Sequence, residues 1–281
     1  MKMKIALLGA GGKMGCRITK KIKDIDKYDI SYVEINEEGI NRLEKLGVSI
    51  TPEKEAVNNG DIIILAIPDR AIKKVSHKIV PWLKAGTIVI GLDPAIPYAG
   101  GLPERKDITY FVVHPCHPPL FHSETNPEAM VNWFGGIAKQ DIVCALYQGP
   151  EEHYKIGENL AKEMFGPILN SYRITVEQMA ILEPALVETF NATLIVAMKE
   201  AYEEVIKMGV PEKAARGFLM GHLRVEFAVI FGYADFVFSD EAMKAIKKGQ
   251  DIIFKPDWKK NIFNLEKIKQ SVEEISESVN N

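Results

Sequence analysis

The segment HPCHPPLFH at residues 114–122 carries three histidines within nine residues and is stiffened by three prolines. Imidazole is the side chain best suited to exchange a proton near neutral pH, and it is also a common metal ligand. His114 directly follows an apolar run, which predicts that it lies at the carboxyl end of a strand. We predict that His114 and His117 are catalytic, that Cys116 is a candidate soft ligand, and that His122 belongs to a surface loop.

Three glutamates interrupt the apolar segment VEQMAILEPALVETFNATL at residues 176–194. Burying a carboxylate costs on the order of several kcal/mol unless it is paired or bound to a cation. Glu177 and Glu188 are 11 residues apart, so an unbroken helix would place them on one face. Pro184 is expected to kink the helix, or to restart it after Glu183, and so to aim a carboxylate into a cleft. Glu188 is the predicted catalytic carboxylate; the alternative is that these acids lie on a solvated helix surface.

A second histidine–carboxylate pair lies in FLMGHLRVEFAVIFG, where His222 and Glu226 are four residues apart and share a helix face. Because the surroundings are apolar, two interpretations stay open. One is a buried pair in which each residue satisfies the other, and the other is a site completed across a dimer interface.

The chain opens with KIALLGAGGKMGCRI, a glycine-rich turn between an expected strand and an expected helix. Glycines there permit a tight turn and close approach of the backbone to a pyrophosphate, while the helix N-terminus supplies free N–H groups. Gly15 would let the helix lie close to the strand. The predicted dinucleotide-binding residues of the turn are Gly9, Gly11, Gly12, Lys13 and Met14.

Glu34 lies 19 residues after Gly15, at the end of the next expected strand. A carboxylate at that position can hydrogen-bond the ribose hydroxyls of NAD and would repel a 2′-phosphate. Asn36 is the alternative contact, and the sequence places no arginine beside Glu34. We therefore predict NAD rather than NADP as the cofactor.

Another expected strand ends in AIPDR, and open α/β sheets bind ligands beyond the carboxyl ends of their strands. Ala66 and Pro68 are therefore predicted to pass near the cofactor. Asp69 either contacts the ribose or caps the next helix. The segment GLDPA at residues 91–95 should reach the same pocket.

The elements that must position these residues alternate in the first half. Apolar, Ile- and Val-rich runs at 4–8, 30–35, 62–67, 87–92, 109–113 and 142–147 alternate with amphipathic segments at 14–24, 39–45 and 71–83. This alternation predicts a Rossmann domain with a mostly parallel, doubly wound sheet. From Thr175 onward the pattern is helical, starting with a capping box of Thr175 and Gln178.

We predict a dinucleotide-binding domain at 1–172 and an all-α substrate and dimerisation domain at 173–281. The helical half is too small and too apolar to stand alone, so a homodimer through this half is expected. The chain has 281 residues, is 47% hydrophobic and has a net charge of −3, which gives no case for nucleic-acid or membrane-surface binding. No run of 18 apolar residues predicts a membrane span. Three scattered cysteines, Cys16, Cys116 and Cys144, indicate reduced thiols in a cytoplasmic protein.

The first half resembles the NAD-binding domain of the 6-phosphogluconate dehydrogenase-like superfamily. More closely, HPCHPPLF, AKQDIVCALYQGPEE, VEQMAILEPALVET and IFKPDWKK resemble a bacterial family of semialdehyde or phosphogluconate dehydrogenase-like proteins, which includes the D-apionate oxidoisomerases. The resemblance implies an NAD-dependent oxidoreductase of carbohydrate metabolism that acts on CH–OH groups of a small, branched sugar acid. Oxidation would be coupled to a shift of a carbon substituent.

The same resemblance implies a divalent cation between His114 and Glu188, with Glu183 or His117 as further candidate ligands. A histidine ligand favours Zn²⁺ or Mn²⁺ over Mg²⁺. Without a metal, His114 would be the general base. Two alternatives stay open: a simple or decarboxylating dehydrogenase without rearrangement, and a dinucleotide-sensing protein without catalysis.

Overall fold

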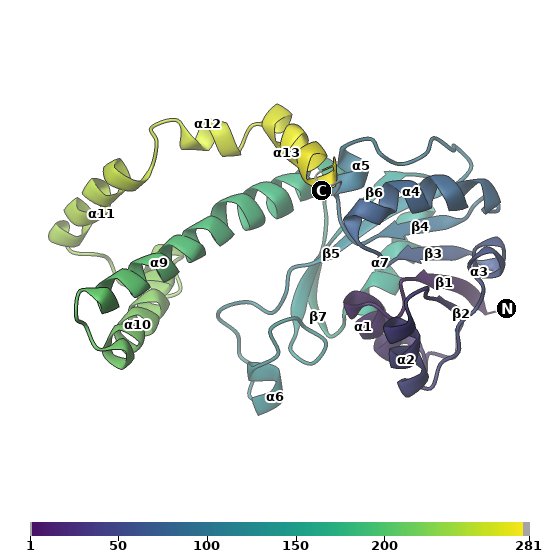
Figure 1. Ribbon diagram of the computed structural model, residues 1–281, viewed down its shortest axis with the longest axis horizontal. Coiled ribbons are helices and arrows are strands. Elements are labelled where there is room, and N and C mark those ends of the chain that lie inside the picture. The colour runs from purple at the N-terminus through teal and green to yellow at the C-terminus, as the bar shows by residue number, and fades with distance from the viewer. Residues whose placement is uncertain (1, 278–281) are drawn as a thin grey trace. The chain divides into compact units, whose positions relative to one another are not determined.

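The computed structural model describes residues 2–277, and within them seven strands form one sheet in the order β2-β1-β3-β4-β5-β6-β7 (Figure 1). Neighbouring strands run parallel, apart from the antiparallel pair β5 and β6. The strands are β1 (Met3–Leu8), β2 (Tyr28–Val33), β3 (Ile62–Leu65), β4 (Ile88–Gly91), β5 (Thr109–Pro115), β6 (Gln140–Gln148) and β7 (Ile168–Arg173).

The helices cover the sheet in the first half and form almost all of the second half. They are α1 (Lys13–Ile22), α2 (Glu37–Lys45), α3 (Glu53–Asn59), α4 (Asp69–Ile79), η1 (Val80–Trp82), α5 (Ala95–Tyr98), α6 (Pro127–Met130), α7 (Glu151–Phe165), α8 (Val176–Ala180), η2 (Ile181–Ala192), α9 (Thr193–Lys207), α10 (Glu212–Ile230), α11 (Asp240–Ile253), α12 (Trp258–Ile262) and α13 (Leu265–Glu277).

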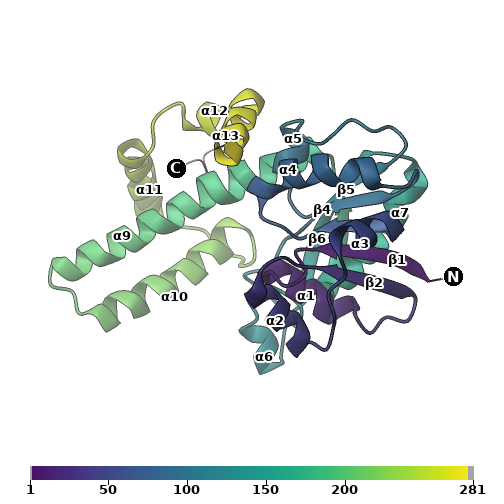
Figure 2. The same cartoon turned by 45° about the vertical axis from the view of Figure 1, so that its right-hand side comes forward.

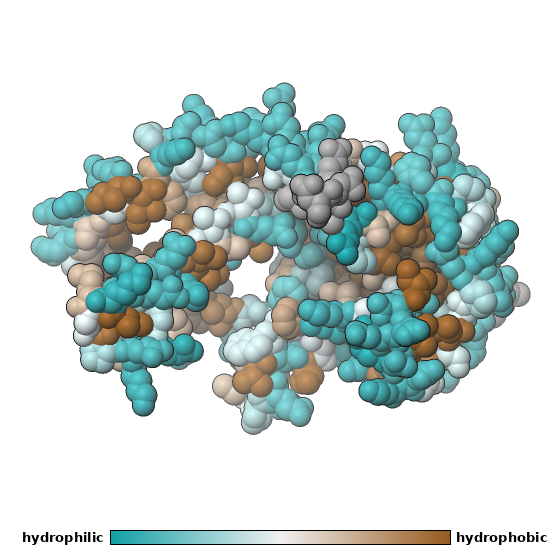
Figure 3. Space-filling model, viewed as in Figure 1, coloured by the Kyte–Doolittle hydropathy of each residue, from teal (hydrophilic) through white to brown (hydrophobic). Residues whose placement is uncertain are grey.

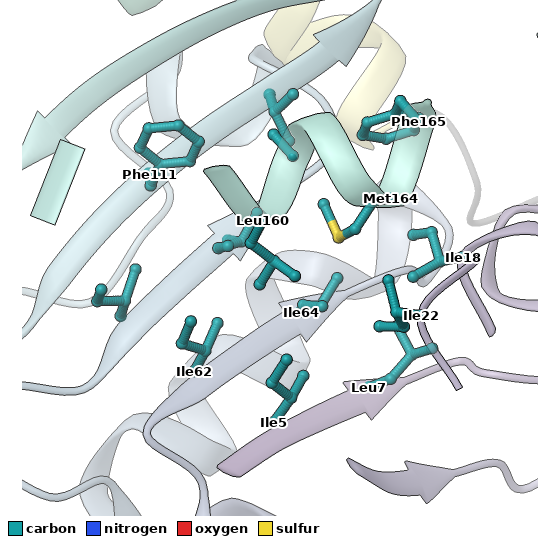
Figure 4. Close-up of a cluster of buried hydrophobic side chains, with 14 of the residues drawn as sticks. Ile5, Leu7, Ile18, Ile22, Ile62, Ile64, Phe111, Leu160, Met164 and Phe165 are labelled. Carbon is teal, nitrogen blue, oxygen red and sulfur yellow. The ribbon is translucent and has the colours of Figure 1, made fainter. Parts of the chain in front are cut away.

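Alternate residues of each central strand enter two different cores, because successive side chains point to opposite faces of a sheet. Ile5 and Leu7 pack with side chains of α1 and α7, whereas Ala6 and Leu8 pack with side chains of α3 and α4. Figure 4 shows the first of these cores, with Leu160 of α7 among the residues that cover the sheet. Helices therefore lie on both faces, and the predicted doubly wound fold is confirmed.

The sheet has one strand that the sequence did not predict. β7 (ILNSYR) pairs with β6 alone and leaves most of its side chains partly or fully exposed. It therefore lacks the continuous apolar run by which the buried strands are recognised. The six predicted strands are all present, with ends that differ by up to a few residues.

The described chain forms two compact units. One contains the chain up to Glu183 together with the segment from Lys269, and the other is Pro184–Ile268. These compact units are defined by contacts within the chain. Domain limits describe parts that fold independently, so the limits of 1–172 and 173–281 stay a prediction. The three cysteines Cys16, Cys116 and Cys144 are free.

Pro184 does not begin a new helix, which was one of the two outcomes that the sequence predicted. It lies inside η2, a π-helical segment that follows α8, whose start carries the predicted reciprocal capping box of Thr175 and Gln178. A π-helix closes i→i+5 hydrogen bonds, so 11-residue spacing no longer implies one face. The expectation that Glu177 and Glu188 share a face therefore loses its basis.

The unit Pro184–Ile268 contains the antiparallel pair of helices α9 and α10 (Figure 2). Within the described part of α9 to α12, Ala215 is the one buried residue. Large apolar side chains are exposed instead, including Phe218 at 69% and Phe231 at 67%. Figure 3 shows apolar side chains on the visible surface of this unit.

The helical stretch Val176–Lys207 is long and apolar enough to cross a membrane by length and composition, and 22% of its most apolar window is buried. Glutamates interrupt this stretch, so it contains no uninterrupted apolar run of the kind that predicts a membrane span from sequence. The core helix of a soluble protein passes the same test of length and composition.

Candidate active site

The glycine-rich turn joins β1 to α1 and leaves no room for side chains. Gly9 has a φ of +77°, a left-handed conformation that favours glycine, and a methyl group there would collide with the Ala66 carbonyl. At Gly15, in the first turn of α1, a methyl group would overlap the Gly9 carbonyl. The helix therefore lies against the turn as the sequence predicted.

A cleft of about 330 Å³ opens beyond the carboxyl ends of β1, β3 and β4. Its walls are the start of α1, the segment between β3 and α4, and the end of β4. The lining residues are Gly12, Lys13, Met14, Leu65, Ala66, Ile67, Pro68, Asp69, Ile72, Leu92 and Asp93. Six of the predicted cofactor-binding residues are in this set, and the cleft is where a doubly wound sheet binds its ligand.

Glu34 closes the glycine turn from the side of β2. Its Oε2 accepts a hydrogen bond from the Gly11 N–H at 2.9 Å, and its Oε1 accepts from the N–H groups of Ile35 and Asn36 at 2.9 and 3.0 Å. The carboxylate is thus held by three backbone donors at the point where the sequence placed it. Asn36 has a different task, because its side chain caps α2.

Arg42 is a residue of this region that sequence reasoning missed. From α2 its Nε donates to the Gly11 carbonyl at 2.7 Å, so Arg42 and Glu34 hold the two sides of the same residue. Arg42 contacts the Gly11 carbonyl and pairs with Glu38, so it approaches the glycine turn from α2. The one sequence signal for Arg42 is its spacing of four residues from Glu38, with which it forms an ion pair on the surface of α2.

His114, near the end of β5, is held between a carbonyl and a carboxylate. Its Nδ1 lies 2.9 Å from the carbonyl of Leu92, a residue that lines the cleft, and its Nε2 lies 3.4 Å from Oε2 of Glu183. Because a carbonyl only accepts, Nδ1 carries the proton and donates. Nε2 is therefore the ring nitrogen that faces Glu183.

His117 has a left-handed backbone with a φ of 63°, in a chain segment rigidified by prolines. Its Nδ1 is buried and makes no hydrogen bond within residues 2–277. Burial, and next the neighbouring His114, lower the pKa of His117, while Glu183 raises it. The neutral form of the imidazole is therefore favoured. Both His114 and Glu183 lie close enough to influence its pKa.

The other two residues of the loop are less suited to chemistry. Cys116 is exposed, but partial desolvation, assisted by Asp141 and Glu183, raises the pKa of its thiol to about 11, which keeps it protonated and weakens it as a soft ligand. His122 is exposed, and its Nδ1 accepts a hydrogen bond from the Glu124 N–H at 3.3 Å.

Both halves of the chain match known protein families. Residues 122–276 match the family described as phosphogluconate dehydrogenase (decarboxylating) C-term, and residues 4–93 match NADP oxidoreductase coenzyme F420-dependent. D-apionate oxidoisomerases from Cupriavidus necator and Rhizobium rhizogenes are each 50% identical to this chain, over 98% and 97% of it and 100% and 99% of their own lengths. The chain belongs to the D-apionate oxidoisomerase family.

A solved structure supports the same family assignment. A semialdehyde dehydrogenase NAD-binding protein from Cupriavidus necator, in complex with calcium and NAD, is 49% identical and has a TM-score of 0.95, covering 98% of this chain and 100% of that one. The resemblance inferred from the sequence motifs is therefore confirmed, and the protein is a member of an oxidoreductase family.

The structure brings only part of the predicted catalytic set together. The carboxylate that lies beside His114 is Glu183. Glu188 is exposed in η2 and belongs to the unit Pro184–Ile268. Within residues 2–277, no group of three or more His, Cys, Asp or Glu side chains forms a metal cluster. The roles of His114, His117 and Glu188 therefore remain predictions.

The pair His222 and Glu226 is not the buried pair that one interpretation expected. Both side chains are exposed on α10, and the Nδ1 of His222 lies 2.8 Å from the Phe218 carbonyl. The cause is that α10 has almost no partners within the described chain.

Proposed function

We propose that this protein catalyses the NAD-dependent oxidation of D-apionate, or of a closely related branched sugar acid, coupled to a shift of a carbon substituent. The observation that carries the proposal is the His114–Glu183 pair, joined through Leu92 to the wall of the dinucleotide cleft. Half of all residues are identical to named D-apionate oxidoisomerases over nearly the whole chain, which supports the substrate class.

NAD is the proposed dinucleotide. Glu34 places a carboxylate at the end of β2, where it disfavours a 2′-phosphate by charge repulsion. The Cupriavidus necator relative was solved with NAD, and it shares 49% of its sequence with this chain. The first turn of α1 and the carbonyls around Ala66 supply donors and acceptors for the cofactor.

A divalent cation fits the donor set at His114 and Glu183. Nδ1 of His114 already donates to a carbonyl, which is the usual arrangement for an imidazole that ligates a metal through Nε2. Nε2 and the carboxylate oxygen are 3.4 Å apart, close enough that both could ligate one ion. His117, whose Nδ1 lacks a partner, and Glu188 are the candidate further ligands.

The same pair supports the reaction in one of two ways. NAD, when bound, supplies the hydride acceptor, and a cation at this pair would supply Lewis acidity toward a substrate oxygen. With no cation there, His114 Nε2 takes the proton of the substrate hydroxyl as the hydride leaves the same carbon, and Glu183 stabilises the imidazolium that forms. In both cases a CH–OH group becomes a carbonyl, which the carbon shift requires.

The helical unit is proposed to bind a second copy of the chain. Its helices expose phenylalanine, valine and methionine side chains that a soluble monomer would not leave in water. A second copy would cover them, which makes a homodimer the proposed assembly.

The decisive experiment combines D-apionate, NAD and the purified protein, and follows NADH formation and the carbon skeleton of the product by NMR. A rearranged skeleton with stoichiometric NADH is expected. An oxidised but unrearranged product, or loss of CO₂, would identify a simple or decarboxylating dehydrogenase instead. Binding of NAD with no turnover of any sugar acid would leave a dinucleotide sensor.

A further inference from the structure

The loop between β5 and β6 is fastened to helix α1 at two points. Lys21 donates from Nζ to the Gly136 carbonyl at 2.6 Å, and the Arg17 guanidinium lies over the ring of Phe134, 4.5 Å from its centroid. The first turn of α1 lines the dinucleotide cleft. The helix that borders the cofactor site therefore also holds the loop that carries the second histidine.

Phe134 continues this connection to His117. The two rings meet edge to face, with centroids 5.7 Å apart and planes at 87°, an arrangement that aromatic pairs favour. The backbone of Phe134 also raises the pKa of the His117 imidazole. Phe134 thus touches Arg17 on one side and His117 on the other, although half of its surface remains exposed.

Local sequence preference does not explain the backbone of His117. A residue before proline is steered toward extended conformations, and Pro118 follows His117 directly. The observed φ of 63° is nevertheless left-handed, a region that residues with side chains enter at a cost. Surrounding contacts must hold this backbone, and the Phe134 ring is one of them.

We propose that Arg17 and Phe134 are positioning residues, which hold the His117 imidazole beside the His114–Glu183 pair. The inference rests on the proposed function for the reaction that His117 serves, but the geometry is independent of the substrate. If these contacts only held the loop against α1, removing the Lys21 contact and removing the Arg17 contact would have the same effect on activity. Positioning instead predicts that the ring of Phe134 matters more than its apolar volume.

Activity measurements separate these possibilities. Phe134→Leu keeps an apolar side chain and removes the ring, and we expect kcat on D-apionate to fall at least tenfold while KM for NAD stays within twofold. Phe134→Tyr should recover most of the loss, because it restores the ring. Arg17→Met should resemble Phe134→Leu, and Lys21→Met should have the smaller effect.

Trp133→Leu is the matched control, since it removes a neighbouring aromatic ring that is 71% exposed. It should leave kcat within twofold of the wild type. A loss in Trp133→Leu equal to that in Phe134→Leu, or an unchanged kcat in Phe134→Leu, would overturn the proposal.

Nitrogen-15 NMR of histidine-labelled protein tests the positioning without any substrate. Signals assigned to His117 by the His117→Gln variant should shift or broaden in Phe134→Leu and stay in place in Trp133→Leu. Unchanged His117 signals in Phe134→Leu would overturn the proposal even if D-apionate is turned over. If the wild type does not oxidise D-apionate, the proposed function fails, while the spectra still decide whether Phe134 positions His117.

Discussion

The Nε2 atom of His114 lies 3.4 Å from Oε2 of Glu183, and the other ring nitrogen is occupied by the Leu92 carbonyl. In the neutral imidazole the proton is therefore on Nδ1, so a lone pair on Nε2 faces a carboxylate. A cation bound by both atoms, or a substrate hydroxyl that gives its proton to Nε2, would fit between this lone pair and the carboxylate. Leu92 lines the dinucleotide cleft, so in the proposed function the pair is placed to serve an oxidation that must remove a proton from an alcohol.

Replacing either partner should abolish this site. In His114→Gln and Glu183→Gln we expect kcat to fall by about 100-fold or more, the range usual for loss of a group that handles a proton or a ligand. Elemental analysis of the purified proteins tells the occupants apart. A cation predicts that metal content falls in both variants, whereas a proton predicts equal content in wild type and variants.

Glu188→Gln completes the comparison, because sequence reasoning named Glu188 rather than Glu183 as the main carboxylate. Metal lost from Glu188→Gln but kept by Glu183→Gln would show that the original choice was right and that the 3.4 Å contact is incidental. Glu177→Gln, an exposed acid in the first turn of α8, is the control and should change neither quantity.

Glu34 should govern the choice between NAD and NADP. In Glu34→Gln the charge that repels a 2′-phosphate is removed, while one amide oxygen remains to accept from Gly11, so the preference for NAD should fall at least tenfold, or about 1.4 kcal/mol. Calorimetric titration with both dinucleotides measures this. An undiminished preference in Glu34→Gln would mean that a group other than Glu34 sets the selectivity. Glu38→Gln, which changes an exposed carboxylate in the first turn of α2, serves as the control.

The glycine turn, the buried strands and the cleft could be predicted because each follows from local rules. Gly9 has a left-handed backbone and Gly15 lies against the Gly9 carbonyl, both of which are local requirements, and Ile- and Val-rich runs identify strands that are covered on both faces. β7 was missed because an edge strand with exposed side chains carries no such run.

The carboxylate that lies beside His114 was harder to predict, because its direction depends on helix type. Glu183 and Glu188 are both glutamates in an apolar stretch, and their facing directions follow from the number of residues per turn. η2 is π-helical, which the sequence signals only through Pro184. Arg42 and Phe134 were missed for a related reason, since each acts on a residue far away in the sequence.

The stability of the protein should decrease in mild acid through His117. Its pKa is lowered, first by burial, so the unfolded chain binds a proton at higher pH than the folded chain does. As pH falls from about 6.5, the usual value of an unfolded histidine, toward the lower folded value, the free energy of unfolding must fall. His117→Asn should remove part of this slope.

Urea unfolding at pH 7.5 and pH 5.5 measures the effect. The difference between the two free energies of unfolding should be smaller in His117→Asn than in the wild type. His122→Asn changes an exposed histidine of the same loop and should keep the wild-type difference. Equal differences in all three proteins would contradict the assignment of the slope to His117.

Dimerisation should depend on the exposed apolar side chains of α9 and α10. Phe218, at 69% exposure, has little of its surface covered by the described chain, so a charge introduced there costs the folded monomer little. If a second copy covers this helix, the same charge is buried without a partner, which costs on the order of several kcal/mol. Phe218→Glu should therefore dissociate the dimer while the sheet domain stays folded.

Lys213→Glu is the matched control, because it places the same carboxylate on an exposed polar position of α10. Light scattering after size exclusion should give twice the chain mass for the wild type and for Lys213→Glu, and the chain mass for Phe218→Glu. A wild type that elutes as a monomer would end the proposal outright. A Phe218→Glu variant that stays dimeric would move the interface away from this face of α10, because a buried glutamate without a partner is incompatible with a close-packed apolar contact.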